Sequence, residues 1–389
     1  MQSEKSYSYL RAMRWIYSWI LFGFAGCQLS GESPDVTSEK SIQAARYAEG
    51  FRWRDFETSQ GSERCLEILS LDRNAIECTV YRDSTSFSAD QAQASPSVVL
   101  GSGGLVTMSS THVALMEPWD PMLLNWSGGG YLDFLQSKSA LERIKNKEVS
   151  NFGGNPEWDH EVIVNARFKA FCIYPYGNPL KDLVWAKDLP IVPIVEYAER
   201  TPLGRAEWMR ALAWMVGDLE LAEADSAFNA IAIQYEAVKS QPLPGSDSLL
   251  VFTGSFDQGA WSAPSGNSFI ATLLQDAGSK YVFANRMETE NVQVSIEELI
   301  EIRNHSDAWG IVLSHPSEEL TLTDLKVMNP QNSIVIPIDG KVFYANTQTC
   351  DYFGWWVAHP DALLQNIRAL LYEDSDIELD SVCFKWISQ

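Results

Sequence analysis

The sequence predicts an α/β protein in which two lobes with parallel-type sheets are joined by one long helix. Short apolar runs of strand length alternate with helical segments in both halves of the chain, and this alternation is typical of parallel sheets covered by helices. Between the halves, apolar residues recur every three or four positions along residues 218–241, which indicates a single helix with one buried face. We therefore expect two three-layer lobes joined by a helix, preceded by a small β ribbon.

The first 26 residues have the composition of a secretory signal. Arg11 and Arg14 precede an apolar run of about a dozen residues that ends in small residues, and this run is shorter than the roughly 20 residues that a membrane-spanning helix needs. The string Phe24-Ala25-Gly26-Cys27 also resembles a bacterial lipobox. It predicts that residues 1–26 are removed, that Cys27 is lipidated, and that residues 27–46 form a tether.

The charge of the chain limits its partners. Lys and Arg number 29 against 51 for Asp and Glu, which gives a net charge of −22 at pH 7. Such an acidic surface repels phosphate backbones, so nucleic acid is not expected as a partner. The 14 Trp residues are a high count and predict stacking surfaces as well as core.

The elements ahead of the long helix form a ribbon and a first lobe. Short runs of alternating apolar and polar residues predict that residues 47–95 contain a β ribbon and a linker. Residues 96–217 are expected to form the N-terminal α/β lobe. Its predicted strands are 98–100, 121–126, 168–174 and 189–197, and its predicted helices are 111–119, 139–147 and 159–166.

The elements after the long helix repeat the pattern. Gly217-Asp218 separates the long helix from the one before it, and a Pro-rich segment at 241–245 ends it. Residues 245–389 are expected to form the C-terminal lobe. Its predicted strands are 249–256, 281–284, 309–313, 334–336 and 342–344, and its predicted helices are 268–277, 295–303 and 360–372.

Five cysteines follow Cys27, and export permits disulfides between them. A three-residue turn at 72–74 would place Cys78 opposite Ile68, so a bond between Cys65 and Cys78 is not expected. The sequence leaves open whether Cys350 pairs with Cys383. It contains no CxxC or Cys/His cluster, so we expect no metal site built by the protein and no cofactor of its own.

Five short motifs carry a family resemblance. They are Ser110-Thr111-His112-Val113-Ala114-Leu115, Thr201-Pro202-Leu203-Gly204-Arg205-Ala206-Glu207-Trp208, Trp261 with Ser265-Gly266-Asn267-Ser268, Asp276-Ala277-Gly278, and His359-Pro360-Asp361. In this order they resemble the substrate-binding proteins of ABC importers for iron–siderophores, haem and cobalamin, whose two lobes are joined by one backbone helix. Met116-Glu117-Pro118-Trp119, where the family usually has Leu-Gly, and the loop 350–356 depart from the pattern.

The resemblance implies a non-catalytic binding protein. It would capture an iron–siderophore, haem or corrinoid between its lobes and deliver it to an ABC permease and its ATPase. The membrane would be contacted only through the lipid at Cys27, with the protein on the periplasmic or cell-envelope face of a bacterial membrane. We expect a monomer.

Candidate ligand-binding residues lie in loops after the predicted strands, where α/β sheets bind ligands. They are Ser110, Thr111, Tyr131, Tyr176, Arg200, Trp261, Ser265, His315 and Tyr352. Aromatic rings among hydroxyl groups suit a large, flat, partly apolar ligand. Trp261 lies in a Gly-, Ser- and Pro-rich segment, where an indole is poorly explained as core. His315 either ligates a metal or is an ordinary loop histidine, and His112 is expected to be structural.

Two carboxylates are candidates for docking. Glu161 and Glu297 each open a predicted helix at matching places in the two repeats, where a carboxylate also stabilises the helix by ~0.3–1 kcal/mol. The resemblance implies that one Glu per lobe pairs with Arg on the permease, and by position these are Glu161 and Glu297, with Glu298 as the alternative for the second.

An enzyme is the competing class, because Trp-rich clefts with paired carboxylates occur in glycoside hydrolases. Asp257, Glu117 and Glu199 are available for such a role. The sequence contains no GxSxG, GxxxxGK or HExxH, and Gly101-Ser102-Gly103-Gly104 lacks the third spaced Gly of a dinucleotide site. A lipid-anchored surface protein that binds ligand without an importer is the other alternative.

The lipobox leads to the first prediction. We expect Cys27→Ser to move the protein from the membrane fraction to the soluble fraction, because the lipid is its expected anchor. Fractionation followed by immunoblotting measures this, with Cys65→Ser as the matched cysteine control. An unchanged membrane fraction for Cys27→Ser would contradict the lipoprotein interpretation.

Overall fold

The computed structural model describes residues 41–388, except 72–74, 91–95, 155–156, 176–185, 187, 244–247, 258, 289–290, 339–340 and 373–381. The predicted signal, Cys27 and the tether up to residue 40 therefore lie outside the described residues, as does Tyr176. Among the helices that are described, none has the length and apolar composition to cross a membrane. From residue 40 onward the chain forms one compact unit.

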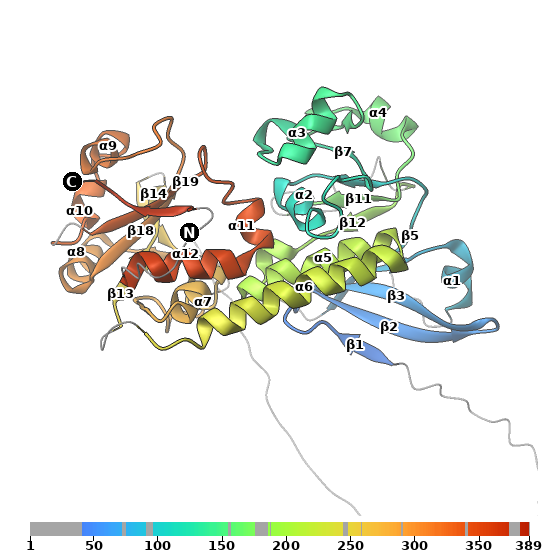
Figure 1. The fold of residues 1–389 in the computed structure, drawn as a ribbon, viewed down its shortest axis with the longest axis horizontal. Coiled ribbons are helices and arrows are strands. Elements are labelled where there is room, and N and C mark those ends of the chain that lie inside the picture. The colour runs from blue at the N-terminus through green and yellow to red at the C-terminus, as the bar shows by residue number, and fades with distance from the viewer. Residues whose placement is uncertain are drawn as a thin grey trace, which may run out of the picture. The chain divides into compact units, whose positions relative to one another are not determined.

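The N-terminal ribbon is a five-stranded sheet (Figure 1). Its strands are β1 (Ile42–Ala44), β2 (Phe51–Thr58), β3 (Gly61–Ser70), β4 (Ala75–Tyr81) and β5 (Ser97–Val99), with the short helix α1 (Ser84–Ala89) between β4 and β5. Ile68 pairs with Cys78, as predicted, but Ser70 pairs with Ala75 beside the turn, and a shift of register between Ile68 and Leu69 separates the two pairings. Leu66 and Ile68 face the main core, whereas Cys65 belongs to a small cluster with Phe56 and Tyr81.

The predicted strand 98–100 belongs to this sheet and not to the first lobe. Val98 pairs in parallel with Val80 of β4, because the crossover through α1 returns the chain in the same direction. The first strand of the N-terminal lobe is β6 (Leu105–Thr107).

The N-terminal lobe is built on an all-parallel sheet with the order β12-β11-β6-β7-β8. The other strands are β7 (Trp126–Gly129), β8 (Ser150–Asn151), β11 (Ala170–Ile173) and β12 (Ile191–Pro193), and the helices are α2 (Ser110–Met116), α3 (Lys138–Lys145) and α4 (His160–Asn165). Strands β9 (Gly153–Gly154) and β10 (Glu157–Trp158) form a separate pair.

The predicted strand 121–126 is a turn over most of its length. The Asp120 carboxylate accepts hydrogen bonds from the backbone N–H groups of Leu124 and Asn125 at 2.9 and 2.7 Å, and Leu123 has a positive φ of 51°. An acidic side chain that caps the turn thus overrides the apolar run, and the strand begins only at Trp126.

Both faces of this sheet are covered. On one face Leu105 and Cys172 join the main core with α2 and the following helix α5. On the other face, the neighbouring residues Val106 and Phe171 form a second cluster with Ile163 of α4. Alternate residues of the same strands therefore pack on opposite sides, which gives the three layers that the sequence predicted.

The C-terminal lobe has a five-stranded sheet with the order β16-β13-β18-β19-β20, in which only β20 is antiparallel. Its strands are β13 (Leu250–Thr253), β16 (Lys280–Tyr281), β18 (Ala308–Leu313), β19 (Val342–Asn346) and β20 (Phe384–Trp386). A smaller sheet contains β14 (Ser255–Asp257), β15 (Ala260–Ala263) and β17 (Val292–Val294).

The helices of this lobe are α7 (Phe269–Asp276), α8 (Ile296–His305), α9 (Leu322–Met328), α10 (Asn332–Val335), α11 (Trp355–Ala358) and α12 (Pro360–Tyr372). The predicted strand 334–336 is wrong, because α10 occupies most of it. The Asn332 side chain donates to the Leu325 carbonyl at 2.9 Å, and Arg303 donates to the Ile334 carbonyl at 3.0 Å. These contacts stabilise the segment as a helical turn.

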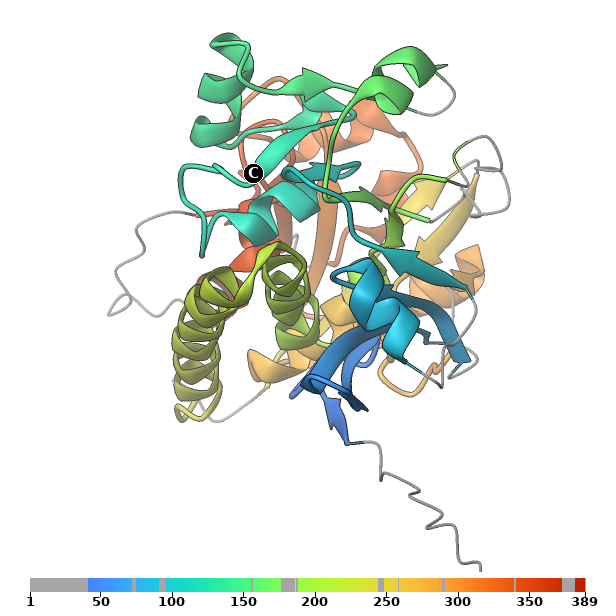
Figure 2. The same cartoon turned by 90° about the vertical axis from the view of Figure 1, so that its right-hand side faces the viewer.

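Two helices connect the lobes, and Figures 1 and 2 show them side by side. Helix α6 (Asp218–Lys239) confirms the predicted joining helix, and its stripe from Ala224 to Val238 is buried. The preceding helix α5 (Pro202–Val216) begins with Thr201, whose hydroxyl accepts the Gly204 N–H, and Pro at the first position. Twelve of its fifteen residues are buried.

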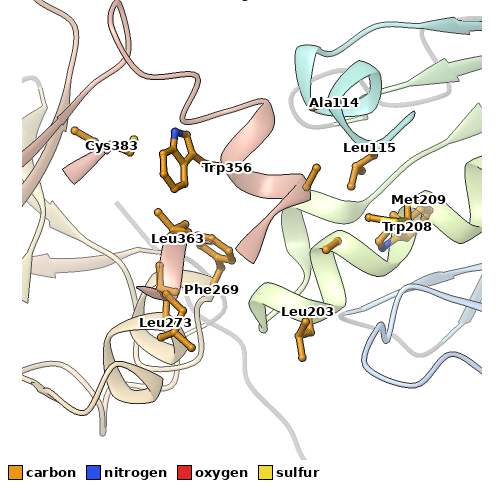
Figure 3. Close-up of a cluster of buried hydrophobic side chains, with 14 of the residues drawn as sticks. Ala114, Leu115, Leu203, Trp208, Met209, Phe269, Leu273, Trp356, Leu363 and Cys383 are labelled. Atoms are coloured by element: carbon orange, nitrogen blue, oxygen red, sulfur yellow. The ribbon is translucent and has the colours of Figure 1, made fainter. Parts of the chain in front are cut away.

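The hydrophobic core is continuous across the two lobes. Figure 3 shows Ala114 and Leu115 of α2 beside Trp208 and Met209 of α5, with side chains of α7, α11 and α12 on the other side. Trp356 of α11 is 4% exposed. The lobes thus share one core, which opposes a wide rotation of one against the other.

Two buried carboxylates fasten the N-terminal sheet to α5. Glu207 accepts the backbone N–H groups of Arg46, Tyr47 and Ala48 at 2.6–2.9 Å, and Arg210 donates to it at 2.7 Å. Glu199 accepts two further backbone N–H groups, from residues 49 and 50, and the indole N–H of residue 208. Both carboxylates are at most 2% exposed, so water cannot replace these charge-assisted bonds. They therefore fix the backbone of residues 46–50, directly before β2.

A disulfide joins Cys350 to Cys383, so the pair that the sequence left open is formed. It ties the segment after β19 to the start of β20. Cys65, Cys78 and Cys172 are free and buried, and burial raises the pKa of the first two thiols to about 12.

The carboxylate contacts lead to the second prediction. We expect Glu207→Gln to lower the free energy of unfolding by about 3 kcal/mol, because a neutral amide removes the charge that pairs with Arg210 and leaves part of the buried N–H cluster without an acceptor. Urea unfolding measures this, with the exposed Glu223→Gln of α6 as control, for which a change within about 0.5 kcal/mol is expected. Equal stability of the two variants would refute the role assigned to Glu207.

Candidate ligand-binding site

The site begins where the strand order of each sheet reverses. In the N-terminal lobe β6 lies between β7 and β11, so the chain leaves β6 and β11 toward opposite sides. The C-terminal lobe repeats this arrangement between β13 and β18. In parallel sheets, ligands bind in the crevice at such positions, beyond the carboxyl ends of the strands.

Loops that follow β6 and β7 in the N-terminal lobe and β19 in the C-terminal lobe meet directly. Thr111, after β6, donates its hydroxyl to the Phe353 carbonyl at 2.5 Å. Gln136, after β7, donates its side-chain amide to the Thr347 carbonyl at 2.7 Å. Helix α11 packs against α2 (Figure 1). The segment from Thr347 to Phe353 is therefore the part of the C-terminal lobe that reaches the N-terminal lobe.

Aromatic side chains stand exposed in these loops. Tyr131 has a left-handed φ of 55° and is 39% exposed, and its ring lies against Gly154, where a Cβ would come within 2.6 Å of it. Phe134, in the 3-10 helix η1 (Leu132–Phe134), is 72% exposed, and Phe353 is 54% exposed. Such rings are solvent-exposed stacking surfaces.

Sequence reasoning missed Phe134 and Phe353. The signal available for Phe134 was its place four residues after the Gly128-Gly129-Gly130 run that ends β7. Phe353 lies in the loop 350–356 that departs from the family pattern, and its reach to the other lobe depends on the disulfide and on α11.

Tyr352 packs inward. Its ring makes edge contacts with Phe353 and Phe384 at centroid distances of 5.1 and 5.8 Å, and burial raises its pKa. It therefore supports the segment that carries Phe353 and presents little of its own surface.

His315 is held by its own loop. The side-chain oxygen of Asn346 accepts its backbone N–H at 3.0 Å, and its ring Nδ1 accepts the Ser317 N–H at 3.1 Å. A neutral imidazole that accepts at Nδ1 carries its proton on Nε2. This arrangement offers a hydrogen-bond donor to a ligand and disfavours ligation of a metal through Nε2.

The structure corrects the expectation for Trp261. The residue lies in strand β15, is 1% exposed, and packs against Phe252, Phe256 and Trp309. It is a core residue, because its indole packs among rings of both the main sheet and the small sheet. Ser265 is also buried, and its carbonyl accepts the hydroxyl of Ser268, which caps α7.

Arg200 lies at a different junction. Its guanidinium approaches Glu49 at 3.5 Å, and its carbonyl accepts the Thr272 hydroxyl of α7 at 2.9 Å. It lines a cavity beside β1 and β2. Ser110 opens α2 beside Thr111 and is half-buried.

His112 is structural, as expected. It is fully buried in α2, and its Nε2 lies 3.5 Å from the carboxylate of Glu196, which is equally buried in the 3-10 helix η3 (Glu196–Ala198). Groups of three or more His, Cys, Asp or Glu side chains that could hold a metal do not occur among the described residues.

The three carboxylates of the enzyme alternative lie in different elements: Glu117 at the end of α2, Glu199 after the 3-10 helix η3, and Asp257 in β14. The Glu199 carboxylate accepts the backbone N–H groups of residues 49 and 50. Glu117 accepts the Ser137 hydroxyl at 2.6 Å, and Asp257 is exposed at the end of β14. These placements favour structural roles for Glu199 and Glu117.

Both docking candidates are exposed in the first turns of their helices, Glu161 in α4 and Glu297 in α8. Glu298, the alternative, lies 3.6 Å from Arg286. An ion pair within its own lobe makes Glu298 the weaker candidate.

Comparisons with known proteins agree with this fold. No family model matches the chain. An uncharacterized lipoprotein of Methanocaldococcus jannaschii is 24% identical over 285 residues, which are 70% of this chain and 65% of that relative. The chain thus spans about two thirds of the relative's length.

Solved structures of similar fold are periplasmic binding proteins. One from Veillonella parvula is 11% identical with a TM-score of 0.55, covering 84% of this chain and 98% of its own. The haem-binding RhuT of Roseiflexus is 13% identical with a TM-score of 0.52, covering 70% of this chain and 99% of its own. FhuD of Vibrio cholerae, solved with ferric Desferal, is 15% identical with a TM-score of 0.50, covering 69% of this chain and 98% of its own. The chain therefore has the two-lobed fold of periplasmic solute-binding proteins, as the sequence predicted.

Two carboxyls between the lobes lead to the third prediction. Burial raises the pKa of Glu117 and of Asp351, and the charge of Asp351 raises that of Glu117 further. A carboxyl whose pKa is higher in the folded than in the unfolded protein contributes its full stabilisation when the pH is below the unfolded pKa of ~4.3. The contribution is lost as the pH rises through the folded pKa. Glu117→Gln removes the titrating group, so we expect the variant not to lose this part of its free energy of unfolding as the pH rises.

Urea unfolding at pH 4 and pH 8 tests the prediction. The quantity compared is the free energy of unfolding of the variant minus that of the unmodified protein. For Glu117→Gln this difference is expected to be more favourable to the variant at pH 8 than at pH 4. For the exposed Glu142→Gln the difference is expected to be the same at both pH values. A stability difference for Glu117→Gln that does not change with pH would contradict the assigned burial.

Proposed function

We propose that this protein binds a metal chelate, an iron–siderophore, haem or corrinoid, between its two lobes. The observation that carries the proposal is the meeting of loops from both sheets, with Tyr131, Phe134 and Phe353 exposed on them. Structures of the same fold include a haem-binding protein and a siderophore-binding protein with its ferric ligand. Rings on facing loops suit a large, partly apolar ligand.

We further propose that the protein is a lipid-anchored component of an ABC importer. The lipobox at Cys27 and the relative described as a lipoprotein support the anchor. Glu161 and Glu297, exposed at corresponding helix starts in the two lobes, would each pair with an Arg of the permease. Such rim contacts orient the complex and speed association more than they add affinity.

Closure around the ligand would be small. The shared core and the two helices α5 and α6 resist rotation of the lobes, so the hydrogen bonds from Thr111 and Gln136 are the contacts expected to change. The ligand would replace loop contacts with its own.

The fourth prediction concerns the ligand. Titration of the purified protein with hemin, cobalamin and ferric siderophores, followed by Trp fluorescence, is expected to give one tight ligand. Phe134→Ala and Phe353→Ala are each expected to weaken its binding by ~1–3 kcal/mol, the scale of a lost stacking surface. Leu124→Ala serves as control, because it truncates an exposed apolar side chain outside these loops, with an exposed fraction of 74% against 72% for Phe134.

Binding weaker than millimolar for every chelate would reject the proposed cargo. Tight binding that both Phe variants leave unchanged would keep the cargo and reject this site.

The fifth prediction concerns docking. We expect Glu161→Arg with Glu297→Arg to abolish cellular uptake of the ligand and to leave its titration unchanged, because the reversed charges repel the permease. Glu142→Arg with Glu301→Arg, exposed positions of helices α3 and α8, is the matched control. Normal uptake by the first pair at confirmed expression would rule out these residues as docking sites.

A further inference from the structure

The two lobes touch at the candidate site through a short segment, from Thr347 to Phe353. The Phe353 carbonyl accepts the hydroxyl of Thr111 at 2.5 Å, and the Thr347 carbonyl accepts the side-chain amide of Gln136 at 2.7 Å. Helix α11, which follows the segment, packs against α2 (Figure 1). Both hydrogen bonds join uncharged groups, and each such bond contributes little net stability. A modest repulsion is therefore enough to open this contact.

Two carboxyl groups lie at the contact, one from each lobe. Glu117 follows the last turn of α2, and its Oε1 accepts the Ser137 hydroxyl at 2.6 Å. Asp351 lies within the segment itself, and its Oδ2 accepts the Trp355 N–H at 2.9 Å. Both side chains are half-buried. Each carboxyl is thus held by its own lobe, and neither of these two bonds crosses between the lobes.

The charges of these carboxyls oppose each other. Burial raises the pKa of both, and the charge of Asp351 raises the pKa of Glu117 further. Within the part of the chain that the structure describes, no Lys or Arg forms an ion pair with either group. The C-terminal end of a helix, where Glu117 lies, also disfavours a negative charge. When both groups are ionised, they repel each other across the contact.

Other ionisable side chains belong to the elements around this contact. His112 of α2 lies 3.5 Å from Glu196, and His359 stacks on Trp355, whose carbonyl lies 3.0 Å from its Nδ1. The remaining ones are Asp120, Asp133, Lys138, Arg205, His315 and Asp361. Of all these groups, none contributes to the raised pKa of Glu117 or Asp351. The charge at the contact is therefore determined by the two carboxyls themselves.

We propose that Glu117 and Asp351 form a proton-operated latch between the lobes. With both groups protonated, the segment from Thr347 to Phe353 closes on the N-terminal lobe. With both ionised, their repulsion breaks the two hydrogen bonds between the lobes and gives a ligand access to the loops of the candidate site. The latch is a property of the free protein, and its control of ligand entry rests on the proposed function.

Proton linkage gives the direction of the effect. A carboxyl whose pKa is higher in the closed than in the open form binds its proton more tightly when the latch is closed. Its contribution to closure is present in full below the ordinary carboxyl pKa of ~4 and is lost as the pH rises through the raised pKa. We therefore expect the latch to be closed at pH 4 and open at pH 8.

The cost of deleting one bond of the latch measures closure without any ligand. Thr111→Val removes the hydroxyl that the Phe353 carbonyl accepts, so it lowers the urea midpoint of the full chain where the latch is closed. We expect this loss to be at least about threefold larger at pH 4 than at pH 8. In a Glu117→Gln background the latch stays closed, and Thr111→Val is expected to cause the same loss at both pH values.

Two controls separate the latch from general effects of pH and charge. Thr272→Val deletes another hydroxyl, which donates to the Arg200 carbonyl at 2.9 Å, and its loss is expected to be the same at pH 4 and pH 8. The exposed Glu142→Gln removes one charge outside the contact. In that background, the difference between the two pH values for Thr111→Val is expected to remain.

Three results would overturn the proposal. An equal loss for Thr111→Val at pH 4 and pH 8 would show that the contact does not depend on protonation. A pH-dependent loss that persists in the Glu117→Gln background would assign its control to another group. The same pH dependence for Thr272→Val would show a change of the whole molecule and not a latch. None of these measurements uses a ligand, so the chelate titration tests the proposed function separately.

Discussion

The burial of helix α5 is the constraint on which the rest of the structure depends. Twelve of its fifteen residues are buried, so it must be covered by both lobes, by α6 and by the N-terminal sheet. Glu207 lies on this helix at 0% exposure, and an ionised group there is tolerated only when its oxygens are fully bonded. The backbone of residues 46–48 supplies those bonds. The N-terminal sheet is therefore an integral part of the fold.

This constraint also determines where motion is available. Side chains of α2, α5, α7, α11 and α12 share one apolar core, so rotating one lobe against the other would open a cavity in the core. The loops above the core are joined by only a few polar bonds, such as those of Thr111 and Gln136. Breaking such bonds costs about 0.5–1.5 kcal/mol each, much less than opening the core. A ligand that enters from these loops can therefore be accommodated without disturbing the frame.

Patterns within one segment were predictable from the sequence, and contacts between segments were not. The joining helix followed from its apolar period. The pairing of Ile68 with Cys78 was predicted from the turn length, but in the structure it depends on a shift of register between Ile68 and Leu69. The burial of Trp261 depends on a small sheet completed by β17, in which Val294, 33 positions further along the chain, pairs with it. Phe134 and Phe353 become candidates only once the two lobes are brought together, and no local period marks them.

The disulfide has a consequence for how the protein withstands proteases. Cys350 and Cys383 are separated by 33 positions, and the chain between them includes α11, which reaches the other lobe, and α12. A single backbone cut anywhere between the two cysteines leaves both pieces attached through the sulfur atoms. Under oxidising conditions, a nicked molecule would thus keep its last strand and its contact with the N-terminal lobe. Only a reductant would release the fragment.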